Sequence, residues 1–265
     1  MRRAAGLTYA EQGSGAAVIC LHGIGGNADS FAPQLDGLSG AFRVIAVNLP
    51  GYGGSEIARS ATGETSFTFP ALAERILAFM DALSLSRAHL LGQSIGGMIA
   101  IEVALRAPAR VAGLGLVATT AAFGGRDDSF REAFLAARLK PLDAGLSMGE
   151  LARRFVPEIT GPAASEAAVE AAIASMAEVP ESTYRAIIRC LVTFNRRDDI
   201  ETLTPPACLI AGEVDENAPA RTMRRMAERM AQARFHQIPG AGHLVNLEAP
   251  ASVNAILHDF FRSIP

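Results

Sequence analysis

Short apolar runs alternate with longer helical patterns in the first half of the chain, and this alternation limits the fold more than any other feature. The runs are continuous and rich in Val, Ile and Leu: "AAVICLH", "FRVIAVN", "AHLLGQ" and "VAGLGLVAT". Strands of a parallel sheet show this pattern because helices bury both of their faces. The sequence therefore predicts an α/β fold, with a mostly parallel central sheet and helices on both faces.

The middle of the chain departs from this alternation. Residues 122–200 are rich in alanine and charged residues, favour helices and carry no strand signal. The alternation resumes at "LTPPACLIAGEVDENAP" and ends with a helix that we expect over residues 249–263. We predict an α/β core formed by residues 1–121 and 201–265, with residues 122–200 inserted as a helical cap.

Composition excludes several classes of protein. The net charge of −3 gives no basic surface for nucleic acid. The apolar runs are shorter than the roughly 20 residues that a membrane-spanning helix needs, so no membrane partner is expected. Cys20, Cys190 and Cys208 are too few and too scattered for a disulfide framework or a zinc site. These features favour a cytoplasmic protein, whose cysteines stay as free thiols in a reducing compartment.

A serine lies between glycines where a strand is expected to become a helix. The stretch "LLGQSIGGMIAIEVAL" places Ser94 in a glycine–X–serine–X–glycine motif, with Gly92 and Gly96 on either side. Such a turn is crowded, and glycines two residues away relieve the crowding. The hydroxyl then stands beside the N-terminus of the next helix, whose free N–H groups stabilise negative charge. The motif predicts that Ser94 is a nucleophile.

A serine nucleophile needs a base and a carboxylate that orients the base. Among five histidines, only His243 lies in a glycine-flanked loop after a strand, "PGAGHLVNLE". Asp215 follows an apolar strand in "CLIAGEVDENAP", where Glu213 and Glu216 are its rivals. Groups that follow parallel strands meet at one edge of the sheet. The chain order therefore predicts a triad of Ser94, Asp215 and His243.

With these motifs, the sequence resembles the serine α/β-hydrolase superfamily, from "YAEQGSGAAVICLHG" through "VNLPGYGGSE" to the C-terminal helix. The resemblance implies that Ser94 is the nucleophile, that His243 is general base and then acid, and that Asp215 fixes the imidazole tautomer. It also implies an oxyanion hole formed by the backbone N–H groups of Ile24 and Ile95. No cofactor is implied, and no His, Asp and Glu cluster has the spacing of metal ligands.

Within the superfamily, the sequence is most similar to the 3-oxoadipate enol-lactonase and carboxylesterase group. The shared features are the histidine loop, the size of the expected cap and the stretch "TYRAIIRCLVTFNRRDDIETLTPPACLIAG". Asn48 departs from the aspartate that is common at its position. The resemblance implies a serine hydrolase of a small carboxylic ester or lactone that forms an acyl-enzyme on Ser94. A small-molecule substrate is the expected partner, and the oligomeric state is left open.

Three alternatives are weighed against this interpretation. Carbon–carbon bond hydrolases of the meta-cleavage type usually carry asparagine and tryptophan where this chain has Gln93 and Leu244. Residues 23–28 spell G-x-G-x-x-A, as in a dinucleotide-binding turn, but the next strand ends in Asn48 rather than an acidic residue. A non-catalytic ligand-binding protein on the same fold stays open.

The expected cap offers candidates for substrate binding. An enol-lactone that carries a free carboxylate requires a cation, and arginine binds a carboxylate through two parallel hydrogen bonds. The candidate arginines, of which Arg131 and Arg189 are taken first, are Arg126, Arg131, Arg138, Arg185 and Arg189. The candidate apolar residues are Phe130, Phe134, Phe155, Met176 and Phe194. Each could instead belong to a solvated helix face or pack the cap onto the core.

Overall fold

The structure is a computed structural model that describes residues 1–57, 67–124, 128–162 and 164–265. Its strands are β1 (Arg2–Ala4), β2 (Leu7–Gln12), β3 (Ala17–Leu21), β4 (Arg43–Val47), β5 (Ala88–Gln93), β6 (Val111–Val117), β7 (Ala207–Gly212) and β8 (Ala233–Ile238). They form one sheet in the order β1-β2-β4-β3-β5-β6-β7-β8. β2 pairs antiparallel with both of its neighbours, β1 and β4. The strands β3 to β8 are parallel to one another. The predicted fold class is confirmed.

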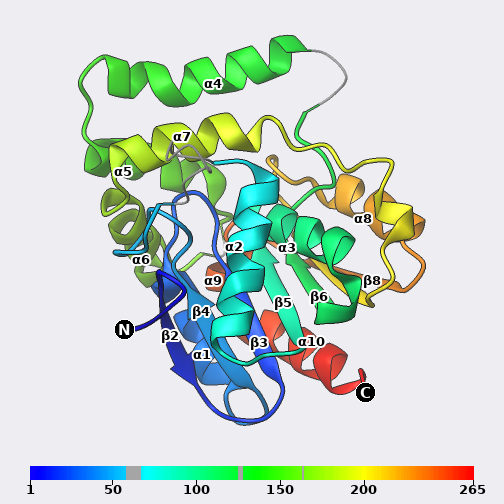
Figure 1. Cartoon of the computed structure of the whole chain (residues 1–265). Coiled ribbons are helices and arrows are strands. Elements are labelled where there is room, and N and C mark those ends of the chain that lie inside the picture. Colours follow the sequence, from blue (N-terminus) through cyan, green and yellow to red (C-terminus); the bar gives the residue numbers. More distant parts are fainter. Residues whose placement is uncertain (58–66, 125–127, 163) are drawn as a thin grey trace.

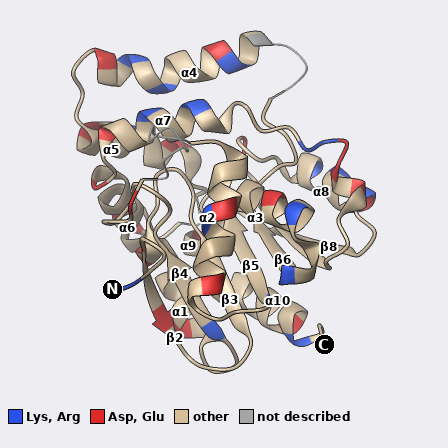
Figure 2. Cartoon of the chain, in the orientation of Figure 1, with Lys and Arg blue, Asp and Glu red and all other residues tan. Residues whose placement is uncertain are grey.

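Helices cover both faces of this sheet. They are α1 (Ala32–Leu38), α2 (Phe69–Ala82), α3 (Ile95–Arg106), α8 (Ala220–Arg229), α9 (Val245–Glu248) and α10 (Pro250–Arg262). α2 and α3 pack together in front of the strands in Figure 1, and α1 and α10 pack together behind them. Figure 2 shows charges of both signs on the outer helices, whereas β3, β5 and β6 carry none. The centre of the sheet is therefore an apolar core.

The junction between β5 and α3 is held from both sides. Every residue of β5 is buried, and α3 is buried from Ile95 to Ala104. The helix is apolar nearly all round, so it packs between the sheet and α2 instead of facing solvent. It ends at Arg106, because Pro108 cannot continue it. The residue between strand and helix, Ser94, is thereby fixed in space.

Four further α-helices lie between β6 and β7 in the part of the chain that the structure describes. They are α4 (Asp128–Asp143), α5 (Met148–Ile159), α6 (Glu166–Ala177) and α7 (Glu181–Leu191). Ser147 caps α5 and forms a capping box with Glu150, and Ser165 caps α6. In Figure 1, α4 and α7 lie along the top of the molecule, and α5 and α6 lie below them at the left. We refer to α4–α7 as the four-helix segment; its treatment as a separate cap remains a prediction.

The two connections to the four-helix segment pair with each other. The Phe123 N–H donates to the Phe194 carbonyl at 2.9 Å, and the Arg196 N–H donates to the Ala121 carbonyl at 2.7 Å. Within the described part of residues 122–200, the β pairing consists of one isolated bridge, between Ala122 and Asn195. The segment therefore leaves and re-enters the core at one place.

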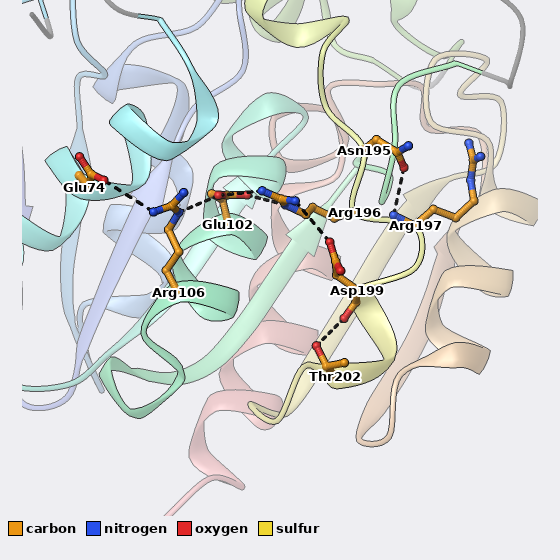
Figure 3. A network of polar contacts seen from close by, with 8 residues as sticks. All are labelled: Glu74, Glu102, Arg106, Asn195, Arg196, Arg197, Asp199 and Thr202. Atoms are coloured by element: carbon orange, nitrogen blue, oxygen red, sulfur yellow. Dashed lines mark hydrogen bonds and ion pairs between the residues drawn. The ribbon is translucent and has the colours of Figure 1, made fainter. Parts of the chain in front are cut away.

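A buried carboxylate ties this place to α3. Glu102 is 1% exposed, and it accepts hydrogen bonds from Arg196 Nε at 2.7 Å and from Arg106 Nε at 2.7 Å (Figure 3). Arg196 Nη2 adds a third bond, at 3.0 Å. Burial acts to raise the pKa of Glu102, but the two arginines outweigh it and hold the pKa below its usual value. The connection at Arg196 is thereby fixed to the helix that follows Ser94.

Among the described residues, no helix combines the length and apolar character needed to cross a membrane.

Candidate active site

Ser94 has a backbone conformation that is rare for residues other than glycine. Its φ is 54° and its ψ is −122°. The Ser94 N–H donates to the Val117 carbonyl at 2.9 Å, and Thr119 Oγ1 donates to the Ser94 carbonyl at 2.7 Å. Strained conformations of this kind persist only where the surroundings hold them, and they cluster at functional sites. The neighbouring strand β6 therefore fixes the turn on which the Ser94 hydroxyl stands.

The flanking glycines are required by close backbone contacts. A Cβ atom on Gly92 would collide with the backbone of Gly96 and Gly97, and a Cβ atom on Gly96 would collide with the Leu21 carbonyl. These contacts let the helix begin directly against the ends of β3 and β5. The spacing of the motif thus has the steric cause that the sequence predicts.

Three side chains from different loops form a hydrogen-bonded chain. His243 Nε2 lies 3.0 Å from Ser94 Oγ, and His243 Nδ1 lies 2.8 Å from Asp215 Oδ2. An ionised carboxylate only accepts hydrogen bonds, so Nδ1 carries the proton and Nε2 is left to accept one from the Ser94 hydroxyl. The structure thus places the three predicted residues in the order that a nucleophile, its base and an orienting acid require.

The environment of Asp215 keeps its carboxylate ionised. Its side chain is fully buried, and Oδ1 accepts from the Asn217 N–H at 2.8 Å and from the Ala218 N–H at 3.1 Å. Burial acts to raise its pKa, but His243 and the two backbone donors outweigh burial and lower the pKa. Neither rival hydrogen-bonds to the His243 ring: Glu213 accepts from the Gly240 N–H at 2.9 Å, and Glu216 is exposed.

A second histidine shapes the loop after β3. His22 is fully buried, its Nδ1 lies 2.7 Å from the Gly23 carbonyl, and its Nε2 lies 3.0 Å from the Leu49 N–H. The amide of Leu49 can only donate, so His22 Nε2 is the acceptor and Nδ1 carries the proton. Burial lowers the pKa of His22 to about 4, so the ring is neutral at pH 7. Its hydrogen bonds connect the loop after β3 to the loop after β4.

The predicted oxyanion residues come from two different parts of the chain. Ile95 opens α3, so its N–H has no acceptor within the helix. Ile24 lies on the cavity wall in the loop after β3, and its carbonyl accepts a hydrogen bond of 2.9 Å from the Tyr52 hydroxyl. Asn48 supports the same loop through the Ala28 N–H, which donates to its Oδ1 at 2.8 Å. Asn48 Nδ2 donates to Thr8 Oγ1, a bond that an ionised aspartate could not make.

A cavity of about 540 Å³ opens beside Ser94 and His243. Four predicted apolar residues line it, namely Phe130, Phe134, Phe155 and Met176. Further lining residues that the sequence reasoning missed are Met98, Phe123, Tyr184, Ile188 and Leu191. Tyr184, Ile188 and Leu191 recur at helical spacing on α7, which indicates an apolar face but not what that face contacts. Among the described residues, no group of three His, Cys, Asp or Glu side chains could hold a metal ion.

Three of the residues predicted to bind substrate do not line the cavity. Phe194 is buried against Phe69, with ring centroids 4.4 Å apart, because it lies on the connection after α7 and not on a helix facing the cavity. Arg131 lies on α4 beside Phe130 but is not part of the cavity lining. Arg189 is exposed on α7 and donates to the Arg185 carbonyl at 3.1 Å.

Arg138 lines the cavity instead. It follows Phe130 and Phe134 at intervals of four residues, and this spacing places all three on one face of α4. Spacing alone does not separate Arg138 from Arg131, which lies seven residues earlier and about 20° away around α4. Arg126, another candidate, lies outside the described residues.

Comparisons with known proteins identify the family of the chain. The family model described as alpha/beta hydrolase fold matches residues 16–250. The "Putative carbamate hydrolase RutD" of Caulobacter sp. (strain K31) is 31% identical over 92% of this chain and 89% of its own length. The 3-oxoadipate enol-lactonase 1 of Acinetobacter baylyi is 25% identical over 94% of this chain and 89% of its own.

Solved structures give the same result. A thermophilic esterase from Thermogutta terrifontis matches with a TM-score of 0.86 and 25% identity, covering 97% of this chain and 93% of that one. The sheet order, the strained serine and the matched family model lead to one conclusion: the chain belongs to the alpha/beta hydrolase fold family.

Proposed function

We propose that the protein is a cofactor-independent serine hydrolase of small carboxylic esters or lactones. The observation that carries this proposal is the hydrogen-bonded chain from Ser94 through His243 to Asp215 at the wall of the cavity. Relatives that include an enol-lactonase and a structurally similar esterase support the class of reaction.

The chemistry proceeds in two halves. Ser94 Oγ attacks the substrate carbonyl carbon while His243 Nε2 takes the hydroxyl proton, and Asp215 stabilises the imidazolium that forms. The tetrahedral intermediate collapses when its C–O bond breaks and the imidazolium returns the proton to the departing alcohol. Water then attacks the acyl-enzyme with His243 again as the base, which releases the acid and restores the Ser94 hydroxyl. In a lactone the leaving alcohol stays attached to the acyl chain.

The oxyanion of each tetrahedral intermediate needs donors that are already in place. We assign this role to the backbone N–H groups of Ile95, at the start of α3, and Ile24, in the loop after β3. Each such donor contributes about 3 kcal/mol in comparable sites. Because the donors belong to the backbone, the side chains at these positions influence mainly the shape of the cavity.

The four-helix segment completes the proposed site. We assign residues 122–200 to a cap whose α4, α5, α6 and α7 supply the apolar wall opposite Ser94. A largely apolar enclosure of this volume suits a small organic substrate, since such sites usually measure roughly 300–1,000 Å³.

The test is a rate comparison on a small panel of substrates. The panel pairs a short neutral aryl ester with an enol-lactone that bears a carboxylate, using wild type, Ser94→Ala, and Ser182→Ala as the matched control because Ser182 is exposed on α7. We expect hydrolysis by wild type and the control, and background rates with Ser94→Ala. Turnover that survives in Ser94→Ala would contradict the nucleophile assignment. Binding without any turnover would favour the non-catalytic alternative.

A further inference from the structure

Arg138 is a charged side chain of the cavity wall that lies against aromatic rings. Its guanidinium carbon is 3.7 Å from the ring centroid of Phe155 and 5.2 Å from that of Phe134. The side chain is half-buried on α4. Among the described residues, no carboxylate forms an ion pair with it. A stacked guanidinium keeps its edge N–H groups available, because the ring contacts only the face of the plane.

Other charged groups near the site are placed differently. Glu216 and Arg221 also line the cavity, but both are exposed. Arg185, on the neighbouring helix α7, pairs with Glu181 and Asp143 at 2.7 Å each. Arg138 differs from these groups because it is half-buried and, among the described residues, has no acidic partner. It lies in the part of the cavity wall formed by α4 and α5.

The groups that act on the Arg138 charge are few. Burial lowers its pKa, and Tyr184 and Glu158 act in the opposite direction. Glu158 is exposed on α5. Burial raises the pKa of Tyr184 to about 12, so its hydroxyl is neutral at pH 7 and can donate a hydrogen bond. The guanidinium itself stays protonated at any pH at which the protein is folded.

We propose that Arg138 binds a free carboxylate of the substrate, so that the enzyme prefers esters or lactones of dicarboxylic acids. The inference deepens the proposed function and rests on it. A bound carboxylate would supply the anion that the guanidinium lacks in the structure, through a planar two-bond contact that an ammonium could not reproduce. The Phe155 and Phe134 rings shield part of the guanidinium from solvent, which strengthens the interaction. Charge recognition at Arg138 would then hold the scissile carbonyl toward Ser94.

The experiment uses two matched probes, 4-nitrophenyl hydrogen glutarate and the neutral 4-nitrophenyl pentanoate, which have acyl chains of equal length. The variants are Arg138→Met, which keeps an apolar stem, Arg138→Lys, which keeps the charge, and Arg189→Met as the exposed control on the neighbouring helix. We expect Arg138→Met to lower kcat/KM for the glutarate ester by about 10- to 100-fold, mainly through KM. The pentanoate ester should change less than about threefold, and Arg138→Lys should retain an intermediate preference for the acid.

Each contrary outcome has a separate meaning. Equal losses on both esters in Arg138→Met, or no loss on the glutarate ester, would overturn the role of Arg138 while Ser94-dependent hydrolysis still stands. If neither ester is hydrolysed in a Ser94-dependent manner, the proposed function fails. Calorimetric titration with glutarate then decides the inference: wild type should bind it at least tenfold more tightly than Arg138→Met, and equal affinities would overturn it.

Discussion

The backbone N–H of His243 donates a hydrogen bond of 2.7 Å to the carbonyl of Ile159, the last residue of α5. The histidine loop and the four-helix segment therefore hold each other in place. Gln93 adds a second contact, because its Nε2 donates to the His243 carbonyl at 3.0 Å. The position of the proposed base depends on residues that come from three separate parts of the chain.

Glu248 is expected to be the residue that orders this loop. Its Oε2 accepts from the Gly161 and Gly242 N–H groups at 2.7 and 2.8 Å, and its Oε1 accepts from the Leu244 N–H at 2.8 Å. Glu248→Gln replaces one acceptor oxygen with a donor that faces these N–H groups, so kcat should fall about tenfold or more and Tm should fall with it. The control is Glu228→Gln on the exposed side of α8. Unchanged kcat in Glu248→Gln would rule out the positioning role.

Asp215→Asn should impair catalysis severely without unfolding the protein. The amide can donate toward Nδ1 and so favours the tautomer with the proton on Nε2, which cannot accept from Ser94. The expected loss of kcat is about 10⁴-fold, as in other triads. Glu213→Gln and Glu216→Gln should keep wild-type kcat because neither side chain hydrogen-bonds to the His243 ring. A larger loss in either glutamate variant than in Asp215→Asn would move the acid to that residue.

We expect the folded protein to lose stability in acid because of His89. It is buried beside Phe261, with ring centroids 4.5 Å apart, and among the described residues no group hydrogen-bonds to its Nδ1. Burial, with the charge of Arg87, lowers the pKa of His89 to about 4 from its usual 6.5. The folded state therefore favours the neutral ring, so the contribution is fully present above pH 6.5 and is lost as the pH falls toward 4.

Urea unfolding at several pH values measures this contribution. The free energy of unfolding of wild type should fall by up to about 3 kcal/mol through His89 between pH 7 and pH 4. His89→Leu should show a shallower dependence on pH, with the remaining acid sensitivity coming from His22 and other groups. Parallel curves for the two proteins would show that His89 does not titrate as described.

The Glu102 and Arg196 pair should stabilise the connection between α7 and β7. Arg196→Met leaves a carboxylate that is 1% exposed with Arg106 as its remaining arginine partner, and it should cost about 3 kcal/mol in unfolding free energy (Figure 3). Glu102→Gln together with Arg196→Met should cost less than the sum of the single changes. Additive losses would mean that the two residues act independently.

The sequence predicts which three polar side chains meet at the proposed site better than it predicts the walls around them. Ser94 follows from glycines whose spacing has a local steric cause, and Asp215 and His243 follow from loops that end parallel strands. These signals are local or depend on sheet topology, which fixes where strands end. The close approach of Gly92 to Gly96 is an example of a contact that the motif already implies.

The cavity wall could not be predicted in the same way. Helical spacing groups Phe134 with Arg138, yet it does not say whether that face meets the cavity, solvent or another helix. The prediction of Arg189 is wrong for this reason, since its side chain is exposed on α7. Phe194 lies beyond the end of α7 and packs on Phe69. The orientation of α4–α7 depends on tertiary packing that no short window of sequence contains.

Covalent labelling of Ser94 tests the central claim most directly. Wild type is incubated with an alkyl fluorophosphonate, and loss of esterase activity is compared with label stoichiometry by intact mass and peptide mass spectrometry. We expect one label per chain, on the peptide that carries Ser94, with activity falling in proportion and with slower labelling in Asp215→Asn. Ester hydrolysis that persists after full labelling, or a label on a different residue, would contradict the claim.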